Sequence, residues 1–295
     1  MRRILIFHNA FANKGRSRLG LAKINVWLRT EKIQSLVVET RTDFDGNLTA
    51  LQKAFDDFNP TEIWVSGGDG TLYLLINSLP DSMWHLPVAV LPTGSGNDFI
   101  KNYLPKTSFN DALQAALRGS STPCDVWQCN NLLFIHGLGI GFDGQVVESM
   151  IKRKTLLKGF LGYYYHVIGQ LLRYREKEFV LEAKGSKTTF NCFMITVGNS
   201  TTFGGGFKIT PKAKINDRLL DVCAISEVSV LQRPLYLKKV EHGNHLHLPM
   251  VNYFTADEIT INTPQIVAGH IDGELFYGNS FEIKKHSKQL NIITG

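Results

Sequence analysis

The most restrictive feature of this sequence is a glycine-rich stretch that directly follows an apolar run. The apolar run covers residues 63–65, and residues 66–72 read Ser-Gly-Gly-Asp-Gly-Thr-Leu. A buried strand, a glycine turn and the start of a helix form a backbone cradle that can bind phosphate groups. The alternative is a tight turn without a ligand. Asp69 would repel a phosphate, so we expect a divalent metal between its carboxylate and the phosphate groups.

Composition limits the class of protein. The length of 295 residues fits one large or two ordinary domains. Four cysteines without a Cys-x-x-Cys pair indicate free thiols in a reducing cytoplasm. The apolar run at residues 4–7 is too short for a signal peptide, and no run reaches the roughly 18 apolar residues of a membrane span. A net charge of +6 suits an anionic substrate or membrane surface and gives no reason to expect nucleic acid.

The first 124 residues alternate between two periodicities. Short apolar runs, which predict buried strands, alternate with segments whose apolar residues have helical spacing. This alternation is typical of a doubly wound parallel sheet with helices on both faces. Ligands of such sheets bind at the carboxyl ends of the strands, where the glycine stretch lies. The expected strands cover residues 4–7, 36–38, 63–65 and 88–91, and the expected helices cover 19–29, 48–58 and 112–117, with another continuing from 72–76.

A second glycine-rich turn follows the strand at 88–91. Residues 92–99 read Pro-Thr-Gly-Ser-Gly-Asn-Asp-Phe. They could form a simple helix entry capped by Asn97 or Asp98. Because both glycine turns follow strands of one sheet, we expect them to face the same nucleotide.

The pattern changes near residues 119–125, where we place a domain boundary. Short strands separated by turn residues then dominate, which is typical of a β-sandwich or open barrel. The expected domains are 1–124 and 125–295, and the last strand is free to return to the first domain. The expected strands cover residues 132–136, 179–183, 190–197, 219–225, 258–261, 265–268, 281–284 and 290–293.

One long helical region is expected in this half, at residues 150–177. Its basic residues and aromatic side chains suit an interface with anionic lipid heads, although an ordinary helix packed on the sheet would show a similar pattern. The basic and aromatic run contains Lys152, Arg153, Lys154, Lys158, Phe160, Tyr163, Tyr164 and Tyr165. Three histidines at 242, 245 and 247 are interpreted as a polar loop, because spacing supplies no further zinc ligand.

The first glycine turn resembles the nucleotide loop of diacylglycerol and sphingoid lipid kinases, NAD kinases and phosphofructokinases. With the second turn, the resemblance narrows to the diacylglycerol kinase catalytic-domain family, in its soluble bacterial form related to sphingosine kinases. That family has threonine where this chain has Ser95, which keeps the hydroxyl. Residues 136–143, 204–217 and 271–276 also resemble the family, so the match covers nearly the whole chain. It implies an N-terminal nucleotide-binding domain like that of NAD kinase and phosphofructokinase, and a C-terminal β-sandwich for the lipid substrate.

The resemblance also implies ATP and Mg²⁺ as ligands. The threonine that contacts ATP after the second strand corresponds best to Thr42, with Thr40 as the alternative. The implied ATP-binding residues are Asn9, Thr42, Gly67, Gly68, Asp69, Gly70, Thr71, Leu72, Tyr73, Leu74, Ser95 and Asn97.

Two further roles follow from the same resemblance. A bound magnesium is implied at Asp217 with the main-chain carbonyls of Lys214 and Leu219. Glu274, with Asp272 nearby, is implied as the catalytic base for the acceptor hydroxyl. Asp69 is the second catalytic candidate, and it competes with Glu274 for the role of base.

Besides Ser95, the chain departs from the family pattern at three places. Arg218 replaces a glycine, which costs on the order of 1 kcal/mol if the turn needs a positive φ. Residues 9–13 read Asn-Ala-Phe-Ala-Asn in place of Asn-Pro-x-Ser-Gly, which predicts weaker phosphate contacts. Tyr73 and Leu74 replace the usual asparagine and glutamate.

The sequence therefore predicts an ATP-dependent lipid kinase that phosphorylates the hydroxyl of diacylglycerol or a related lipid. The alternatives are an NAD kinase-like enzyme with a soluble substrate and a non-catalytic homologue that binds lipid or nucleotide. We expect a cytoplasmic protein with peripheral contact to anionic membranes and no nucleic-acid partner. Whether it forms a homodimer is left open.

Overall fold

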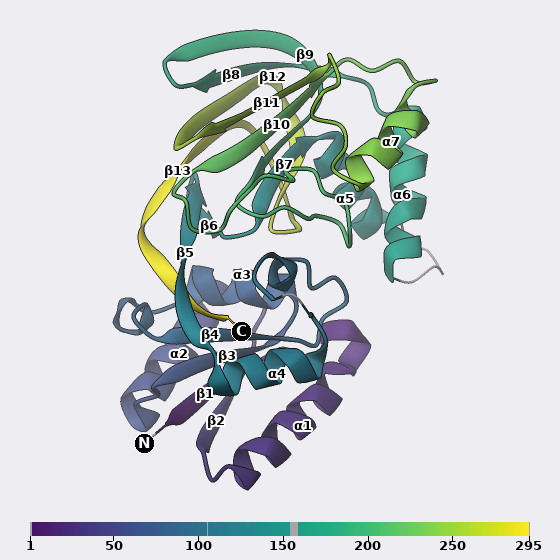
Figure 1. Cartoon of the computed structure of the whole chain (residues 1–295). Helices are drawn as coiled ribbons and strands as arrows, with labels where there is room; N and C mark the ends of the chain where they lie inside the picture. Colours follow the sequence, from purple (N-terminus) through teal and green to yellow (C-terminus); the bar gives the residue numbers. More distant parts are fainter. Residues whose placement is uncertain (1, 105, 154–158, 295) are drawn as a thin grey trace. The chain divides into compact units, whose positions relative to one another are not determined.

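The computed structural model describes residues 2–104, 106–153 and 159–294, and its chain divides into two units (Figure 1). The first unit contains Met1–Val126 and Ser287–Gly295, and the second contains Trp127–His286. The expected boundary after residue 124 lies two residues before this division.

A parallel sheet forms the centre of the first unit. The strand order is β13-β4-β3-β1-β2, and β13 (Glu274–Thr294) joins it through Asn291 and Ile292, which pair with β4. All pairs in this order are parallel, which confirms the expected sheet. Strands β1 and β3 are buried almost throughout, as continuous apolar runs in parallel sheets usually are. The other bounds are β1 Arg3–His8, β2 Gln34–Glu39, β3 Glu62–Gly67 and β4 Pro87–Pro92.

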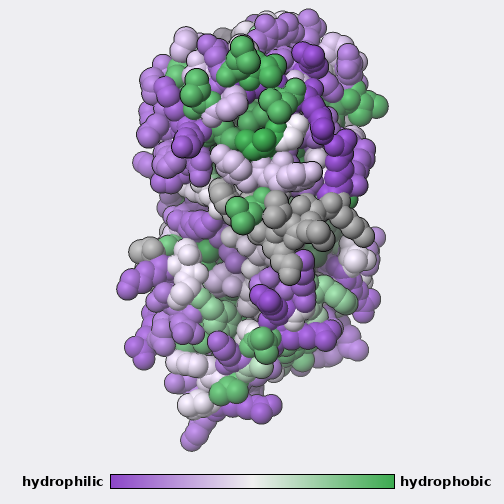
Figure 2. Space-filling view, turned by 90° about the vertical axis from the view of Figure 1, so that its right-hand side faces the viewer, coloured by the Kyte–Doolittle hydropathy of each residue, from purple (hydrophilic) through white to green (hydrophobic). Residues whose placement is uncertain are grey.

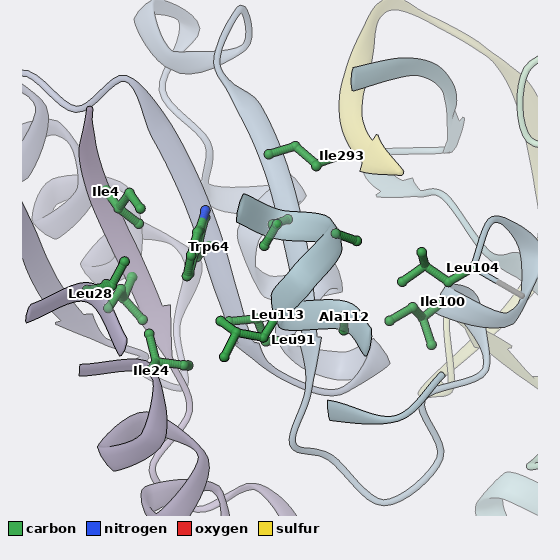
Figure 3. Close-up of a cluster of buried hydrophobic side chains, with 14 residues drawn as sticks. Ile4, Ile24, Leu28, Trp64, Leu91, Ile100, Leu104, Ala112, Leu113 and Ile293 are labelled. Atoms are coloured by element: carbon green, nitrogen blue, oxygen red, sulfur yellow. The ribbon is translucent and has the colours of Figure 1, made fainter. Parts of the chain in front are cut away.

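Four α-helices cover this sheet. Ile24 and Leu28 of α1 and Leu113 of α4 belong to a buried cluster with Ile4 and Trp64 of the sheet (Figure 3). Helices α2 and α3 pack against each other and against β2 and β3 respectively. The bounds are α1 Ser17–Thr30, α2 Phe44–Phe58, α3 Asp69–Ser78 and α4 Phe109–Arg118, with short 3₁₀ helices η1 Ala12–Gly15, η2 Asp81–Met83 and η3 Phe99–Asn102.

The second unit is built on antiparallel strands. Their order is β11-β10-β9-β7-β12-β13, and β8 pairs with both β9 and β12. The β-rich second half expected from the sequence is therefore confirmed. Strand β5 (Ser120–Cys129) crosses from the first unit into the second. The other bounds are β6 Leu132–Phe134, β7 Gly137–Gly141, β8 Lys177–Ala183, β9 Ser186–Gly198, β10 Leu220–Ser226, β11 Val251–Ala256 and β12 Glu258–Ile271.

Two pairs of expected strands are single strands in the structure. The stretches 258–261 and 265–268 both belong to β12, and 281–284 and 290–293 both belong to β13. Between Asn262 and Val267 the pairing with β13 shifts register, but the strand continues. The turn-forming residues at 262–264 predicted a break between two strands. A β-bulge explains their presence within one strand, and a local sequence pattern does not distinguish a bulge from a turn.

The long helical region expected over 150–177 is confirmed only in part. Helix α5 (Phe142–Lys152) ends before residue 153, α6 (Gly159–Arg173) begins at Gly159, and Lys177 already starts β8. Lys154 and Lys158 of the basic run lie outside the described residues, as do the side chains of residues 159 and 160. A third helix, α7 (Arg233–Glu241), was not expected. In the part of the chain that the structure describes, no helix is long and apolar enough to cross a bilayer.

Candidate active site

The two glycine turns of the first unit touch each other. The carbonyl of Gly67 accepts hydrogen bonds from the backbone N–H groups of Thr93 and Gly94, at 2.9 and 3.0 Å. A Cβ on Gly94 would lie 2.5 Å from the Cα of Gly68, so this crossing requires glycine. The turns at the ends of β3 and β4 are thus brought to one place, as two phosphate-binding loops would be.

Asp69 braces the two turns. It is the first residue of α3, and its carboxylate oxygens accept hydrogen bonds from the backbone N–H groups of Asp98 and Phe99, both at 3.0 Å. Asp69 therefore caps the amino end of η3 from the other turn. The alternative of a helix entry at Asn97 or Asp98 is confirmed in position, because Asp98 is the N-cap residue of η3. Its side chain makes no capping bond there, and the Asn97 side chain donates to the carbonyl of Gly94. Sequence reasoning missed this bracing role because it joins residues 29 and 30 positions apart.

Asn9 connects β1 to the first glycine turn. Its side-chain nitrogen donates to the hydroxyl of Thr71 at 3.3 Å, and the Gly68 N–H contacts the same hydroxyl at 3.4 Å. The carboxamide oxygen of Asn9 accepts from the N–H of Phe11 at 3.0 Å. Hydrogen bonds thus gather Asn9, Gly68 and Thr71 at the carboxyl edge of the sheet.

The remaining ATP candidates differ in accessibility. Leu72 and Tyr73 are buried, and the Tyr73 ring meets the Phe44 ring edge-on at 5.8 Å, so only their backbone could face a ligand. Leu74 is half-buried, and Ser95 is exposed. Thr42 is also exposed, after the end of β2. Thr40, the alternative, donates its backbone N–H to the carbonyl of His8 in β1.

Glu274 begins β13 in the second unit. It pairs with Ile271 across the turn formed by Asp272 and Gly273. Its side chain reaches solvent, yet surrounding protein atoms and the negative charge of Asp272 raise its pKa above the ordinary value of 4.5. A carboxylate with a raised pKa is a better proton acceptor than an ordinary one.

Asp272 holds this hairpin in place. Its buried carboxylate accepts the backbone N–H groups of Ile135, His136 and Gly137, at 3.1, 3.0 and 2.8 Å. Burial raises the pKa of Asp272, while the positive potential of His136 and the three donors oppose the rise. Asp272 therefore positions the turn that carries Glu274.

The predicted magnesium loop contains a strained residue. Arg218 adopts a positive φ of 65°, the conformation for which the family uses glycine. Asp217 accepts the N–H of Leu219 at 3.1 Å, which leaves its second oxygen for another partner. One carboxylate with main-chain carbonyls is a suitable donor set for a hard cation, so these residues fit magnesium. Within the described ranges, no group of three or more His, Cys, Asp or Glu side chains is placed to hold a metal.

An apolar cavity of about 60 Å³ lies inside the second unit. Its walls come from α5, α6, α7 and the strands β9 to β11, and aromatic and aliphatic side chains form most of them. The sequence singled out some of these residues, such as Tyr163 and His245, but for other roles, because the cavity joins segments far apart in the sequence. Lining residues include Phe142, Val167, Leu171, Phe193, Phe207, Ile225 and Leu237, with the polar Asp143, Arg233 and His245.

Glycine turns at the carboxyl ends of parallel strands define the first unit as a nucleotide-binding α/β fold. Two family models match the chain: the diacylglycerol kinase catalytic domain over residues 3–129, and the YegS C-terminal NAD kinase beta sandwich-like domain over residues 138–294. The chain therefore belongs to the diacylglycerol kinase catalytic-domain family, which confirms the resemblance seen in its motifs.

Named relatives agree with this family. A protein named "Probable lipid kinase YegS-like" from Shewanella frigidimarina is 29% identical over 82% of this chain and 79% of its own length. A diacylglycerol kinase from Bacillus subtilis is 24% identical over 93% of this chain and 90% of its own length. The crystal structure of a diacylglycerol kinase from Bacillus anthracis has the same fold, with a TM-score of 0.74 at 20% identity over 100% of this chain and 97% of the other.

Proposed function

We propose that this protein transfers the γ-phosphoryl group of ATP to a hydroxyl group of a lipid. The observation that carries the proposal is the pair of adjoining glycine turns, braced by Asp69, in a chain of the diacylglycerol kinase catalytic-domain family. The relatives named lipid kinase and diacylglycerol kinase support a lipid acceptor.

The nucleotide is proposed to bind at the carboxyl edge of the first unit. The amino end of α3 offers backbone N–H groups and a favourable helix dipole to the phosphates. Asn9, Thr71, Ser95 and Asn97 line the same edge and would orient them. Asp69 holds the two turns at the spacing that the phosphates need. Bound magnesium would neutralise charge on the transferring group, and the Asp69 carboxylate is its proposed ligand in the first unit. A separate magnesium is proposed in the second unit, held by Asp217 and the main-chain carbonyls of Lys214 and Leu219.

Glu274 is proposed to take the proton of the acceptor hydroxyl. Its raised pKa and its exposure suit that role, and Asp272 fixes the hairpin on which it stands. Positioning and charge neutralisation supply most of the rate enhancement in phosphoryl transfer, so the base contributes only part of it.

Peripheral contact with an anionic membrane is proposed through α6. Leu161, Tyr165, Ile168 and Leu172 are spaced four, three and four residues apart, so they share one helix face, and 66%, 59%, 39% and 61% of their surfaces are exposed. Figure 2, which views the side on which α6 and α7 lie, shows hydrophobic side chains gathered among hydrophilic ones. The basic residues Lys152, at the end of α5, Arg153, which follows it, and Arg173, at the end of α6, are exposed. An apolar face with basic flanks is typical of helices that lie in a lipid headgroup region.

Turnover of radiolabelled ATP tests the function. The purified protein would be offered diacylglycerol, other lipid alcohols and NAD in parallel, with Asp69→Ala as the inactive control and Asp57→Ala as an exposed acidic control on α2. We expect label in the lipid fraction, lost only in the Asp69 variant. Label in NAD alone would indicate a soluble-substrate kinase, and folded protein without any turnover would indicate a binding protein.

A further inference from the structure

The start of α7 exposes two large apolar side chains. Leu231, in the turn that leads into the helix, is 88% exposed, and Leu235, in the first turn of the helix, is 70% exposed. Backbone hydrogen bonds continue from that turn into α7, so two side chains four residues apart lie on one side of it. Single exposed apolar side chains are common on protein surfaces, whereas a group of them marks a contact site.

The buried side chain of Arg233 joins this end of α7 to the end of α6, which packs next to it (Figure 1). Its guanidinium donates hydrogen bonds to the carbonyls of Leu171 and Tyr174 at 2.6 and 3.0 Å, and to the carbonyl of Val228 at 3.0 Å. Leu171 directly precedes Leu172, the last member of the exposed stripe on α6. The apolar stripe of α6 and the apolar start of α7 are therefore fixed to each other by one arginine.

The carboxyl end of α7 is basic. Lys238 and Lys239 are exposed in its last turn. Lys208 is exposed too, and it lies against this end of the helix because its backbone N–H donates to the carbonyl of Glu241 at 3.4 Å. Within the described ranges, none of the three lysines forms an ion pair. Glu241 is half-buried and is the one acidic residue between positions 228 and 248, so this end presents a positively charged surface.

We infer that α7 is a second membrane anchor, which inserts Leu231 and Leu235 among lipids and places Lys208, Lys238 and Lys239 against anionic head groups. This inference rests on the proposed membrane contact of α6 and deepens it. An apolar end beside a basic end is complementary to an anionic bilayer, which offers both hydrocarbon and negative charge. A symmetric contact between two copies through this face would instead bring their lysines together, and like charges repel.

Sedimentation with vesicles tests the apolar end, with phosphatidylcholine alone and mixed with phosphatidylglycerol. Leu231→Glu and Leu235→Glu should each weaken binding to the mixed vesicles about tenfold or more. Leu19→Glu on α1 is the matched control, because Leu19 is 69% exposed, and it should bind like the wild type. Equal losses for Leu235→Glu and Leu19→Glu would overturn the inference. So would wild-type binding by both α7 variants, and a loss in Leu172→Glu alone would then leave the contact to α6.

A charge-matched pair of double variants tests the basic end. Lys238→Gln with Lys239→Gln should weaken binding to the mixed vesicles about fivefold for each lysine and should reduce the effect of salt. Binding to phosphatidylcholine alone should stay unchanged. Lys23→Gln with Lys53→Gln removes the same charge from exposed positions of α1 and α2 and should bind like the wild type. Equal losses in the two double variants would mean that net charge alone attracts the protein, and would overturn the role of α7.

Two further measurements separate this inference from its alternatives. Phosphorylation of lipid in detergent micelles needs no bilayer, so the α7 variants should turn over there at the wild-type rate. No turnover by the wild type in micelles would refute the kinase proposal and leave the vesicle results in force. Size-exclusion chromatography reports the oligomeric state. If Leu235→Glu changes that state and keeps wild-type vesicle binding, the face is a contact between copies and the inference is overturned.

Discussion

Glu274 and Asp69 differ in what their carboxylates already contact. Asp69 accepts two backbone N–H groups, so it is part of the scaffold of the glycine turns. Glu274 is exposed and has a raised pKa, which leaves it available for proton transfer. The two residues can therefore be separated by measuring binding, turnover and stability together.

Glu274→Gln should lower kcat by about 10² to 10⁴, the range for losing a general base. ATP affinity should stay nearly unchanged, because this residue is proposed to contact the acceptor and not the nucleotide. Glutamine keeps the size of the side chain but cannot take a proton at neutral pH. Single-turnover measurements keep product release from masking the chemical step. A wild-type rate in this variant would refute the assignment.

The pH dependence of kcat/KM offers a second check. A base acts only when it is ionised, so activity falls as the pH drops through its pKa. Because the pKa of Glu274 is raised, this acid limb should lie above pH 4.5 in the wild type. The residual activity of Glu274→Gln should lack the limb. If both proteins share one acid limb, another group must be responsible.

Asp69→Ala should abolish phosphoryl transfer and leave the protein folded, with a lower unfolding temperature. Each charge-assisted hydrogen bond to a backbone N–H contributes about 1.5–3 kcal/mol, and two are lost. Asp69→Asn keeps one accepting oxygen, so it should lose less stability while it weakens both Mg-ATP binding and turnover. Calorimetry of nucleotide binding and thermal unfolding would test this. Full activity in a folded Asp69→Ala protein would refute the proposal that the glycine turn containing Asp69 binds the nucleotide.

Arg218→Gly should stabilise the protein. Arg218 has a positive φ, which glycine adopts without steric cost, so a gain of about 0.5–1 kcal/mol is expected after glycine's extra chain entropy is counted. Urea unfolding measures the difference. Lys212→Gly is the control, because that nearby lysine is not among the residues with positive φ, and it should lose stability. A loss for Arg218→Gly would mean that the contacts of the arginine outweigh its strain.

At the scale of elements, α6 presents its apolar stripe to solvent. Replacing Leu172 by Glu should weaken binding to anionic vesicles about tenfold or more, since burial of one large apolar side chain contributes 1.5–3 kcal/mol. Binding of the wild type should also weaken at high salt. Val26→Glu on α1 is the matched control, because Val26 and Leu172 are 65% and 61% exposed. Vesicle sedimentation that shows equal losses for both variants would rule out a specific role for α6.

Strands were predicted correctly from the sequence where the local pattern of apolar residues determines the structure. The apolar runs of β1, β3 and β4 are buried strands because each must lie between two layers of helices. The prediction failed where pairing with a strand distant in the sequence determines the structure. Strand β12 continues through residues 262–267 because β13 bridges its bulge, and nothing near Asn262 in the sequence shows this. The glycine turns could be found from their composition, whereas the bonds of Asp69 and Asp272 depend on folding that brings remote backbone together.

At the scale of the whole molecule, β13 takes part in both units. It begins at Glu274 in the second unit, and its final residues complete the parallel sheet of the first. Removing residues 287–295 should therefore destabilise the first unit. The truncation strips buried Leu290, Ile292 and Ile293, which together contribute about 4–9 kcal/mol. Limited proteolysis and circular dichroism would show whether the first unit survives, and an unchanged melting transition would contradict this expectation.

The course of β13 also bears on how the protein is made. Residues 3–92 leave the ribosome before β13 and supply four strands, but the segment that pairs with β4 follows only after the whole second unit. Until then the outer edge of β4 has unpaired backbone groups, a template on which nascent chains can associate. The order of translation thus keeps the nucleotide-binding half incomplete until the segment that carries Glu274 has been made.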